Sequence, residues 1–425
     1  MIYEPEKECM ARDTLAAQQL EALQAVLARA YLHVPFYRKR FDAGRIDPDE
    51  VRTIADLVRL PFTTREDLQA NYPYGLFAVP LREVVRIHAS TCMSVVVGYT
   101  RNDIKTWSDL MARVLVAGGV SKDDVVQIAL GYNLSTGGFG VHYGAERIGA
   151  SVIPISTGNT RRQLKIMRDF KTTALVATPS YAALLAQTLH EQGTQPGTLA
   201  LRVALLGGEP LLDVLRAEIQ EGLGVVATDN YGLSEVMGPG VAGECQERNG
   251  LHINEDHFLV EVVDPVSLAP VAEGEPGELV ITTLTKEAFP VIRFRTRDLT
   301  RLLPGACPCG RTTRRMARVE RRSDEILIVR GVKVDPRRVV EIFAEIEGHV
   351  PPHQILVEND GVMASLTLLV GVEDSSDFDE VKKQQEHLER LRRGFSSELG
   401  LTVAVRLVEQ RSLEEGKRVV DRRGS

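Results

Sequence analysis

The stretch VVATDNYGLSE, residues 225–235, joins an apolar run to a cluster of polar and aromatic side chains. Helical patterns separate it from four similar apolar runs, namely VVQIAL at 125–130, SVIPIS at 151–156, ALVATP at 174–179 and VALLGG at 203–208. Strands that alternate with helices need crossover connections, which give a largely parallel sheet covered by helices. Side chains that directly follow such a strand lie at the carboxyl end of the sheet, where open α/β folds bind ligands. The pattern predicts an α/β fold with a ligand site near residues 229–235.

The character of the sequence changes after residue 258. Segments such as FLVEVVD, GELVITTL and VIRFRTRDL are β-rich and are joined by Pro/Gly turns, which predicts a β subdomain at about 258–323. From residue 324 onward a helix, two strands, a charged helix and a further strand predict a small α+β unit. We therefore expect a large N-terminal domain over 1–323 and a second domain over 324–425.

Composition excludes several classes of protein. The chain has 425 residues, 44% of them hydrophobic, and a formal net charge of −7, so a disordered chain or a globally basic surface for nucleic acid is not expected. The start, MIYEPEKECMARD, is too charged for a signal peptide, and no run of about 18 apolar residues follows. We expect a cytoplasmic protein without a membrane partner. Its five cysteines do not suggest a disulfide framework.

Further motifs stand in a fixed order around YGLSE. GGEP occupies 207–210, RFRTRD ends at Asp298, RRSDEILIVRG occupies 321–331, and EGKRVVDRR contains Lys417. In this order the set resembles the adenylate-forming superfamily and, within it, the phenylacetate-CoA ligase family. The segments LPFTTREDLQANYPYG, VVGYT, GYNLSTGGFGVHYGAERIGA, GLHINEDHF and CGRTT are similar to that family as well, over roughly residues 30–425.

The resemblance implies two steps, in which a carboxylate and ATP form an acyl-adenylate and the thiol of coenzyme A then releases AMP. Such chemistry depends on positioning and on charge neutralisation of the triphosphate. We expect Glu235 to bind Mg²⁺, Lys417 to act in adenylation, and Ser90 and Thr91 to lie in the phosphate loop. The expected nucleotide-binding residues are Gly207, Gly208, Glu209, Pro210, Asp229, Asn230, Tyr231, Gly232, Ser234, Asp298 and Arg322. A homodimer is the expectation at family level.

In this set Tyr231 offers a face for adenine, while Asp298 and Arg322 are placed for the ribose. Each has a structural alternative: Tyr231 could be core, Asp298 could cap a turn, and Arg322 could pair with Glu320 or Glu325. The acyl group needs a flat apolar slot lined by small and aromatic residues. The expected substrate-binding residues are Tyr132, Phe139, Gly140 and Ala145 on one side and Val236, Met237, Gly238 and Pro239 on the other. A packed strand-to-helix turn is the alternative.

Two stretches depart from the family pattern. The phosphate loop passes from Ser90 through Thr91, Cys92, Met93 and Ser94 to Val95 with neither glycine nor lysine, although glycine is what allows a backbone to wrap a phosphate. The segment around Lys417 is also short. We interpret both as residues missing from the printed sequence; a degenerate enzyme is the alternative. An intact mass equal to the 46.9 kDa of this sequence would contradict the first interpretation.

Cysteines and a histidine suggest a metal site that the ligase chemistry does not need. Cys307 and Cys309 flank Pro308 on a Gly-bounded turn, and Cys245 and His252 flank a probable loop. Three thiolates and one imidazole suit a structural tetrahedral Zn²⁺ site. The usual CxxC spacing is absent, so buried free thiols or a redox pair remain alternatives, and His257 is a less favoured substitute for His252.

A charged stretch lies where the two domains meet. Asp324 is the expected hinge of a mobile C-terminal domain, and residues 332–336 would then face coenzyme A. Nine arginines and Lys333 stand between Arg311 and Arg338 against four carboxylates, a local surplus that ion pairs could use up. Two other functions stay open: an enzyme that loads a carrier-protein thiol, and a non-catalytic nucleotide-binding protein.

Overall fold

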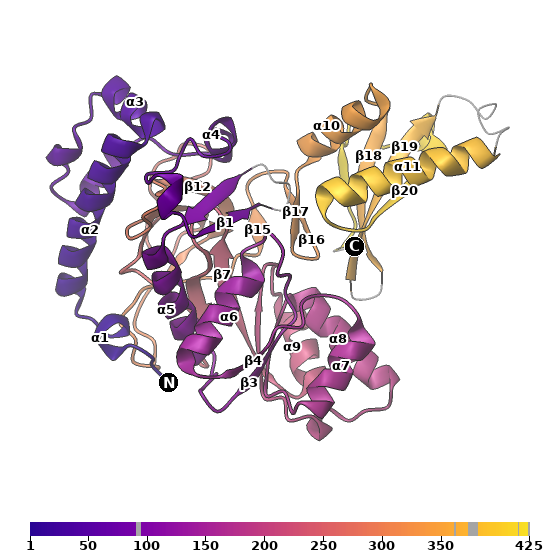
Figure 1. Ribbon diagram of the computed structural model, residues 1–425, viewed down its shortest axis with the longest axis horizontal. Helices are drawn as coiled ribbons and strands as arrows, with labels where there is room; N and C mark the ends of the chain where they lie inside the picture. Colours follow the sequence, from indigo (N-terminus) through magenta and orange to yellow (C-terminus); the bar gives the residue numbers. More distant parts are fainter. Residues whose placement is uncertain (91–94, 361–362, 373–380, 415, 424–425) are drawn as a thin grey trace. The chain divides into compact units, whose positions relative to one another are not determined.

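The computed structural model describes residues 1–90, 95–360, 363–372, 381–414 and 416–423. The chain divides into two compact units, Met1–Ser323 and Asp324–Ser425, which are coloured from indigo to orange and from orange to yellow in Figure 1. Each unit is described by itself. No helix in the described ranges combines the length and the apolar character that a bilayer crossing requires.

A nine-stranded sheet with the order β13-β14-β9-β8-β7-β6-β5-β3-β4 forms the centre of the first unit. Its parallel half contains the five apolar runs expected from the sequence: β3 (Val125–Ile128), β4 (Ser151–Ile153), β5 (Ala174–Ala177), β6 (Val203–Gly207) and β7 (Val226–Leu233). The connecting helices are α6 (Gly137–Ile148), α7 (Thr160–Asp169), α8 (Pro179–Glu191) and α9 (Asp213–Leu223). A 3-10 helix, η4 (Pro196–Thr198), follows α8. The predicted crossover architecture is confirmed.

Beyond β7 the sheet continues antiparallel. These strands are β8 (Gly238–Glu244), β9 (Leu251–Ile253), β14 (Arg315–Met316) and β13 (Leu302–Leu303). The proposed β subdomain is therefore not one separate sheet, because β13 and β14 lie within its bounds and pair with the central sheet instead. The remaining strands of that region form a four-stranded antiparallel sheet of β10 (Phe258–Val263), β11 (Gly277–Thr283), β12 (Phe294–Thr300) and β15 (Arg321–Arg322).

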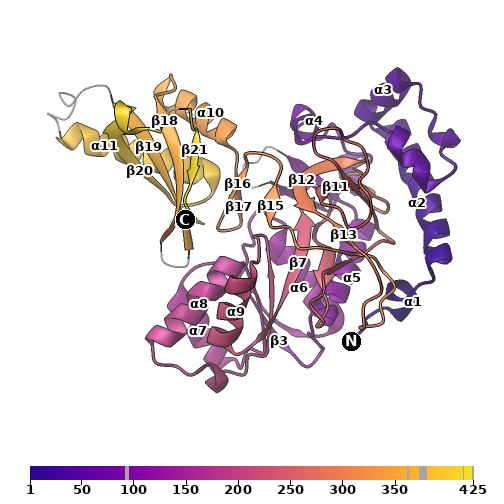
Figure 2. The ribbon, with the colours of Figure 1, turned by 180° about the vertical axis from the view of Figure 1, so that it is seen from behind.

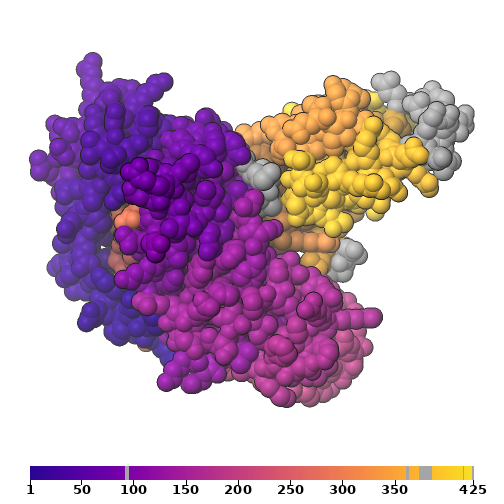
Figure 3. All heavy atoms as spheres, viewed as in Figure 1, coloured from indigo at the N-terminus to yellow at the C-terminus, as the bar shows by residue number. Residues whose placement is uncertain are grey.

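The amino-terminal part of the chain, in indigo, covers one flank of this unit (Figure 3), and it is largely helical. Its helices are α1 (Pro5–Glu8), α2 (Arg12–His33), α3 (Pro35–Gly44) and α4 (Arg65–Ala70), with 3-10 helices η1 (Pro48–Glu50), η2 (Ile54–Arg59) and η3 (Leu81–Glu83). Pro35 ends the periodic pattern of α2 and occupies the first turn of α3, where its missing N–H costs nothing. The ribbon of β1 (Arg86–Ala89) and β2 (Val96–Tyr99) leads into α5 (Arg101–Ala117), which starts with a Thr100/Asp103 capping box.

The described part of the second unit contains a four-stranded sheet in the order β20-β19-β18-β21, a two-stranded sheet of β16 and β17, and two α-helices (Figure 2). Its elements are β16 (Leu327–Val329), β17 (Val332–Val334), α10 (Pro336–Glu347), β18 (His353–Asp360), β19 (Met363–Val372), α11 (Val381–Leu399), β20 (Val403–Glu409), η6 (Gln410–Ser412) and β21 (Val419–Asp421). Phe343 of α10 meets Phe395 of α11 edge-on with ring centroids 4.6 Å apart. The order helix, two strands, helix, strand agrees with the sequence pattern, whereas β21 is too short to be predicted.

Candidate active site

Three of the expected nucleotide-binding side chains form a hydrogen-bonded chain between the nine-stranded and the four-stranded sheet of the first unit. The Tyr231 hydroxyl donates to Asp298 Oδ2 over 2.6 Å, and the Arg322 guanidinium pairs with Asp298 Oδ1. Asp298 on β12 lies opposite Arg322 on β15, so the sheet register holds this pair together. Burial raises the pKa of Tyr231 well above its usual range, and the charge of Asp298 adds to the shift. The phenol therefore remains protonated and remains the donor.

The glycine pair after β6 brings backbone close to β7. A Cβ on Gly207 would lie 2.6 Å from both Nδ2 and the backbone oxygen of Asn230, and Gly208 has φ 80°, which favours glycine. The Glu209 carboxylate accepts hydrogen bonds from the backbone N–H of Ser180 (3.0 Å) and from its hydroxyl (2.9 Å). Glu209 thus ties the loop that continues to Pro210 to the first turn of α8, a role that the sequence does not reveal.

The turn between β7 and β8 contains the rest of the YGLSE motif. A Cβ on Gly232 would lie 2.0 Å from the Gly238 carbonyl oxygen, so only glycine allows this tight hairpin. The Ser234 and Thr136 hydroxyls are 2.9 Å apart, which links the turn to the start of α6. Glu235 is only 3% exposed. A buried carboxylate at a turn is a ligand type that Mg²⁺ accepts.

Asp229 and Asn230 take part in holding β7 in the sheet. Asn230 Nδ2 donates to the Leu206 carbonyl oxygen over 2.7 Å, and the Asp229 backbone N–H donates to Glu244 Oε2 over 2.8 Å. Burial, followed by the charge of Glu244, raises the pKa of the Asp229 carboxyl well above its usual range. Both residues therefore have structural partners, and their contact with a nucleotide stays a prediction.

Ser90 and Val95, the described residues on either side of the expected phosphate loop, are hydrogen-bonded to each other. The Ser90 backbone N–H donates to the Val95 carbonyl oxygen over 2.8 Å, and the Val95 N–H donates to Ser90 Oγ over 3.1 Å. Thr91 and the three residues after it lie outside the described residues. These two hydrogen bonds extend the β1–β2 ribbon by one residue pair beyond Ala89 and Val96.

The residues expected to bind the acyl group gather around Trp107 of α5. A Cβ on Gly140 or on Gly238 would lie 2.5 Å from the Trp107 ring, and Trp107 Nε1 donates to the Pro239 carbonyl oxygen over 2.8 Å. The rings of Tyr132 and Phe139 meet edge-on with centroids 5.2 Å apart. Ala145, Val236 and Met237 belong to the same buried core. The two predicted walls are therefore packed against one indole.

Three side chains of this cluster were not anticipated as part of it: Tyr99, His88 and Lys286. Tyr99 stacks on Trp107, and its hydroxyl donates to the Met237 carbonyl oxygen over 2.7 Å. Lys286 is 2% exposed, with Nζ 3.1 Å from the centroid of the Tyr99 ring. Its burial lowers its pKa to about 7. A single lysine within the apolar stretch LVITTLTKEAFPVI is a signal that the sequence does contain.

His88 lies in the same aromatic group. Its Nδ1 is 2.9 Å from the Leu134 carbonyl oxygen, and among the described residues its buried Nε2 has no hydrogen-bond partner. Burial lowers the pKa of His88, so the ring is neutral near pH 7. An orphaned buried nitrogen costs free energy unless a ligand, a water or another part of the chain satisfies it.

Lys417 and Asp324 belong to the second unit. Lys417 lies two residues before the start of β21, and its ammonium donates to Glu414 Oε2 over 2.7 Å. Asp324 is its first residue, and its carboxylate accepts a hydrogen bond from the Ile326 N–H at 3.3 Å. The roles of Lys417 in adenylation and of Asp324 as a hinge stay predictions.

Ion pairs inside each unit use much of the positive surplus between Arg311 and Arg338. Arg311 pairs with Glu8, Arg314 with Glu255, and Arg318 with Asp213. Arg337 and Arg338 pair with carboxylates of the second unit. Carboxylates within the same unit therefore neutralise much of this positive surplus.

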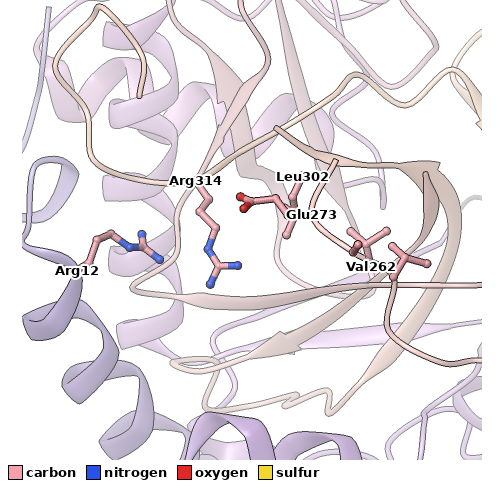
Figure 4. Close-up of a pocket in the computed structure, with 7 residues that line it drawn as sticks. Arg12, Val262, Glu273, Leu302 and Arg314 are labelled. Atoms are coloured by element: carbon pink, nitrogen blue, oxygen red, sulfur yellow. The ribbon is translucent and has the colours of Figure 1, made fainter. Parts of the chain in front are cut away.

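A hollow of about 480 Å³ lies on the first unit. In Figure 4, Arg12 and Arg314 lie at one side of it and Val262 at the other. Glu273 and Leu302 also line it. None of the residues expected to bind nucleotide or acid borders this hollow. Arg12 at its rim pairs with Glu255. We therefore do not assign the hollow to the acid or to the nucleotide.

Models of known protein families match a stretch of each unit of the chain. Residues 120–285 match the AMP-binding enzyme family, and residues 331–423 match the AMP-binding enzyme C-terminal domain. The chain is 47% identical over 420 residues to a phenylacetate-coenzyme A ligase of Escherichia coli (strain K12), covering 97% of this chain and 95% of that protein.

It is 44% identical over 446 residues to a phenylacetate-coenzyme A ligase of Thermus thermophilus, covering all of both chains. A solved structure of 2-hydroxyisobutyryl-CoA ligase in complex with 2-HIB-AMP and CoA superimposes with a TM-score of 0.92 at 26% identity, covering 99% of this chain and 92% of that one.

Proposed function

Because the chain belongs to the phenylacetate-coenzyme A ligase family of AMP-forming enzymes, we propose that it joins an aromatic or arylacetic acid to coenzyme A. In the first step a carboxylate oxygen attacks the α-phosphorus of ATP, and pyrophosphate leaves as the acyl-adenylate forms. In the second step the thiol of coenzyme A attacks the acyl carbon and AMP leaves with the bonding electron pair of the broken C–O bond. The thiol proton passes to solvent.

The observation that carries this proposal is the Tyr231–Asp298–Arg322 chain at the carboxyl edge of the parallel strands. Asp298 is a buried carboxylate that already accepts from a phenol and a guanidinium, so its orientation is fixed before a ligand arrives. A carboxylate held in this way can also accept from the two hydroxyls of a ribose, and charge-assisted hydrogen bonds of this kind are strong. The Tyr231 ring lies next to it and offers a face for adenine.

The acid would enter the cluster around Trp107. The backbones of Gly140 and Gly238 pack directly against the indole, and Tyr132, Phe139 and Met237 supply apolar surface. Neutral His88 adds a polar group without charge, and Lys286, with a pKa of about 7, is about half protonated near pH 7. This chemistry fits a flat aromatic ring with a short carboxylate arm.

A divalent metal ion and a catalytic lysine complete the proposed active site. Glu235 is the residue expected to bind Mg²⁺, which would neutralise phosphate charge, and Lys417 is the cation expected to assist adenylation. If the expected phosphate loop is complete as printed, it offers neither glycine nor lysine to the phosphates, and the first step would then depend heavily on the metal. A homodimer stays a prediction that light scattering can test.

ATP–pyrophosphate exchange over a panel of aromatic and aliphatic acids tests the function. Exchange that requires an aromatic acid, followed by AMP release on addition of coenzyme A, would support the proposal. Exchange together with AMP release that requires a carrier-protein thiol, and does not occur with coenzyme A, would point to the loading enzyme instead. Nucleotide binding without exchange would contradict catalysis, and the intact mass measured on the same sample would show whether the printed loop is complete.

A further inference from the structure

Four metal-binding side chains of the first unit meet at the end of β8 that is remote from the YGLSE turn. The ligand atoms of Cys245, His252, Cys307 and Cys309 all lie within 4.8 Å of one another. Cys245 and Cys307 are 2% and 6% exposed, and His252 is 6% exposed. The cysteines are free thiols, so no disulfide explains their approach.

The spacing of the four groups matches a tetrahedral ion. Zinc bonds of about 2.3 Å to sulfur and about 2.0–2.1 Å to nitrogen place two sulfurs about 3.8 Å apart and a sulfur and a nitrogen about 3.6 Å apart at tetrahedral angles. Cys245 Sγ and Cys307 Sγ are 3.7 Å apart, and Cys309 Sγ is 3.4 Å from His252 Nε2. The side chains therefore already outline two edges of the coordination tetrahedron.

Neighbouring groups orient the ligands as they do in metal sites. His252 Nδ1 lies 3.2 Å from the Thr313 hydroxyl, which leaves Nε2 directed at the thiols. Arg311 lies beside the Cys309 sulfur. Three thiolates around a divalent ion leave one negative charge, and the guanidinium of Arg311 offsets it.

The sheet and one loop bring these residues together from distant parts of the sequence. Cys245 follows β8, and His252 lies on β9 opposite Arg315 of β14. Cys307 and Cys309 lie in the loop between β13 and β14, where the Gly310 N–H donates to the Cys307 carbonyl oxygen over 3.2 Å. An ion here would cross-link two strand ends to a loop that has no regular hydrogen-bond ladder of its own.

The same loop carries the start of the chain. The Thr312 N–H donates to the Glu8 carbonyl oxygen over 3.0 Å, and Arg311 donates to the Met1 carbonyl oxygen over 2.7 Å. The Cys9 thiol donates to the Gly310 carbonyl oxygen over 3.3 Å. The conformation of residues 305–314 therefore determines how the first twelve residues pack against this loop.

From this geometry we infer that Cys245, His252, Cys307 and Cys309 bind one Zn²⁺ ion, which fastens the β13–β14 loop and, through it, the N-terminal segment. Four protein ligands leave no open position, so the ion is structural and takes no part in the ligase reaction. The inference does not depend on the proposed function.

Metal analysis and native mass spectrometry of the full chain, purified without a metal-affinity tag, test it. We expect about one zinc per chain in the wild type and in Cys9→Ser, and less than about a tenth in Cys307→Ser and Cys309→Ser. Cys9 is the matched control because it contacts the same loop but is not one of the four ligands. Chelation of the wild type should lower its melting temperature by on the order of 10 °C.

Hydrogen exchange on the wild type gives a readout that does not depend on whether the variants fold. Removal of zinc should speed exchange in residues 305–315 and 1–12, while the loop at 207–210 should stay unchanged. A wild-type chain that carries no zinc and does not respond to the chelator would overturn the inference. So would a stoichiometric metal other than zinc, or an intact mass that reveals a disulfide among the four residues.

Discussion

The two ends of strand β8 are built on opposite principles. At Gly238 the strand leaves the YGLSE turn, where Lys286 is buried against Tyr99 and His88 Nε2 lacks a partner among the described residues. At the other end Cys245 meets two further thiols and an imidazole whose second nitrogen is held by Thr313. The Gly238 end contains buried polar groups whose burial costs free energy. The Cys245 end contains four side chains that can together bind one metal ion.

The two ends of β8 therefore differ in their expected role, one in ligand binding and the other in stability. Costly buried groups are typical of sites that must receive a ligand, whereas closed ligand sets are typical of structural cross-links. Changes at the Gly238 end should therefore affect activity and in some cases raise stability. Changes at the Cys245 end should lower stability and leave the chemistry of folded molecules intact.

The largest effect is expected from Lys286→Met. Below about pH 7 Lys286 is protonated in both folded and unfolded chains, and the folded chain bears the full desolvation cost. Between pH 7 and 10.5 only the unfolded chain keeps the proton, so the stability of the wild type rises with pH. The variant should be more stable by about 3 kcal/mol at pH 6.5, and this advantage should shrink toward pH 10.

Urea unfolding at pH 6.5, 8 and 9.5 measures this advantage. Lys105→Met, which changes an exposed lysine on α5, is the control and should show no such narrowing. An advantage for Lys286→Met that does not change with pH would mean that burial does not lower the pKa of Lys286.

Asp298→Asn is expected to slow ATP–pyrophosphate exchange by about 10- to 100-fold, because a charge-assisted bond to the ribose becomes a neutral one. Arg322 loses its counterion, so unfolding curves are needed to separate lost stability from lost catalysis. Asp264→Asn, at a surface turn, is the control. Unchanged exchange in a folded Asp298→Asn would remove Asp298 from the nucleotide site.

Gly140→Ala should cost about 1–3 kcal/mol and reduce activity most for the bulkiest acids, because the new methyl group meets the Trp107 ring. Gly197→Ala is the matched control, since nothing lies within 4 Å of its added Cβ. Relative rates over the acid panel and chemical denaturation give the two measurements. Equal losses for every acid would argue that Gly140 serves packing alone.

Glu209→Ala should have the smallest effect, about 1 kcal/mol, because α8 loses an acceptor and a negative charge at its first turn. The equivalent change at the other end of the same helix, Glu191→Ala, should be close to neutral. Thermal unfolding compares the two. Equal shifts for both variants would contradict the capping role of Glu209.

Local patterns in the sequence were sufficient for much of the fold. The five apolar runs became parallel strands because their alternation with amphipathic helices permits few other arrangements. β13 and β14 have two residues each, too few to produce a pattern, so their pairing with the central sheet could not be predicted. Lys286 contacts segments that lie far from it in the sequence, such as the one that contains Tyr99. The periodicity of each segment does not show that the two segments meet.

The sequence by itself determined the family, the strand-to-turn position of Tyr231 and the presence of four residues able to bind zinc, because motifs and residue types are local properties. Only the tertiary structure decided that Asp298 meets Tyr231, that Glu209 ties its loop to α8, and that Cys245 lies 3.7 Å from Cys307. Such contacts arise from strand register and from the packing of side chains, which no short stretch of sequence specifies.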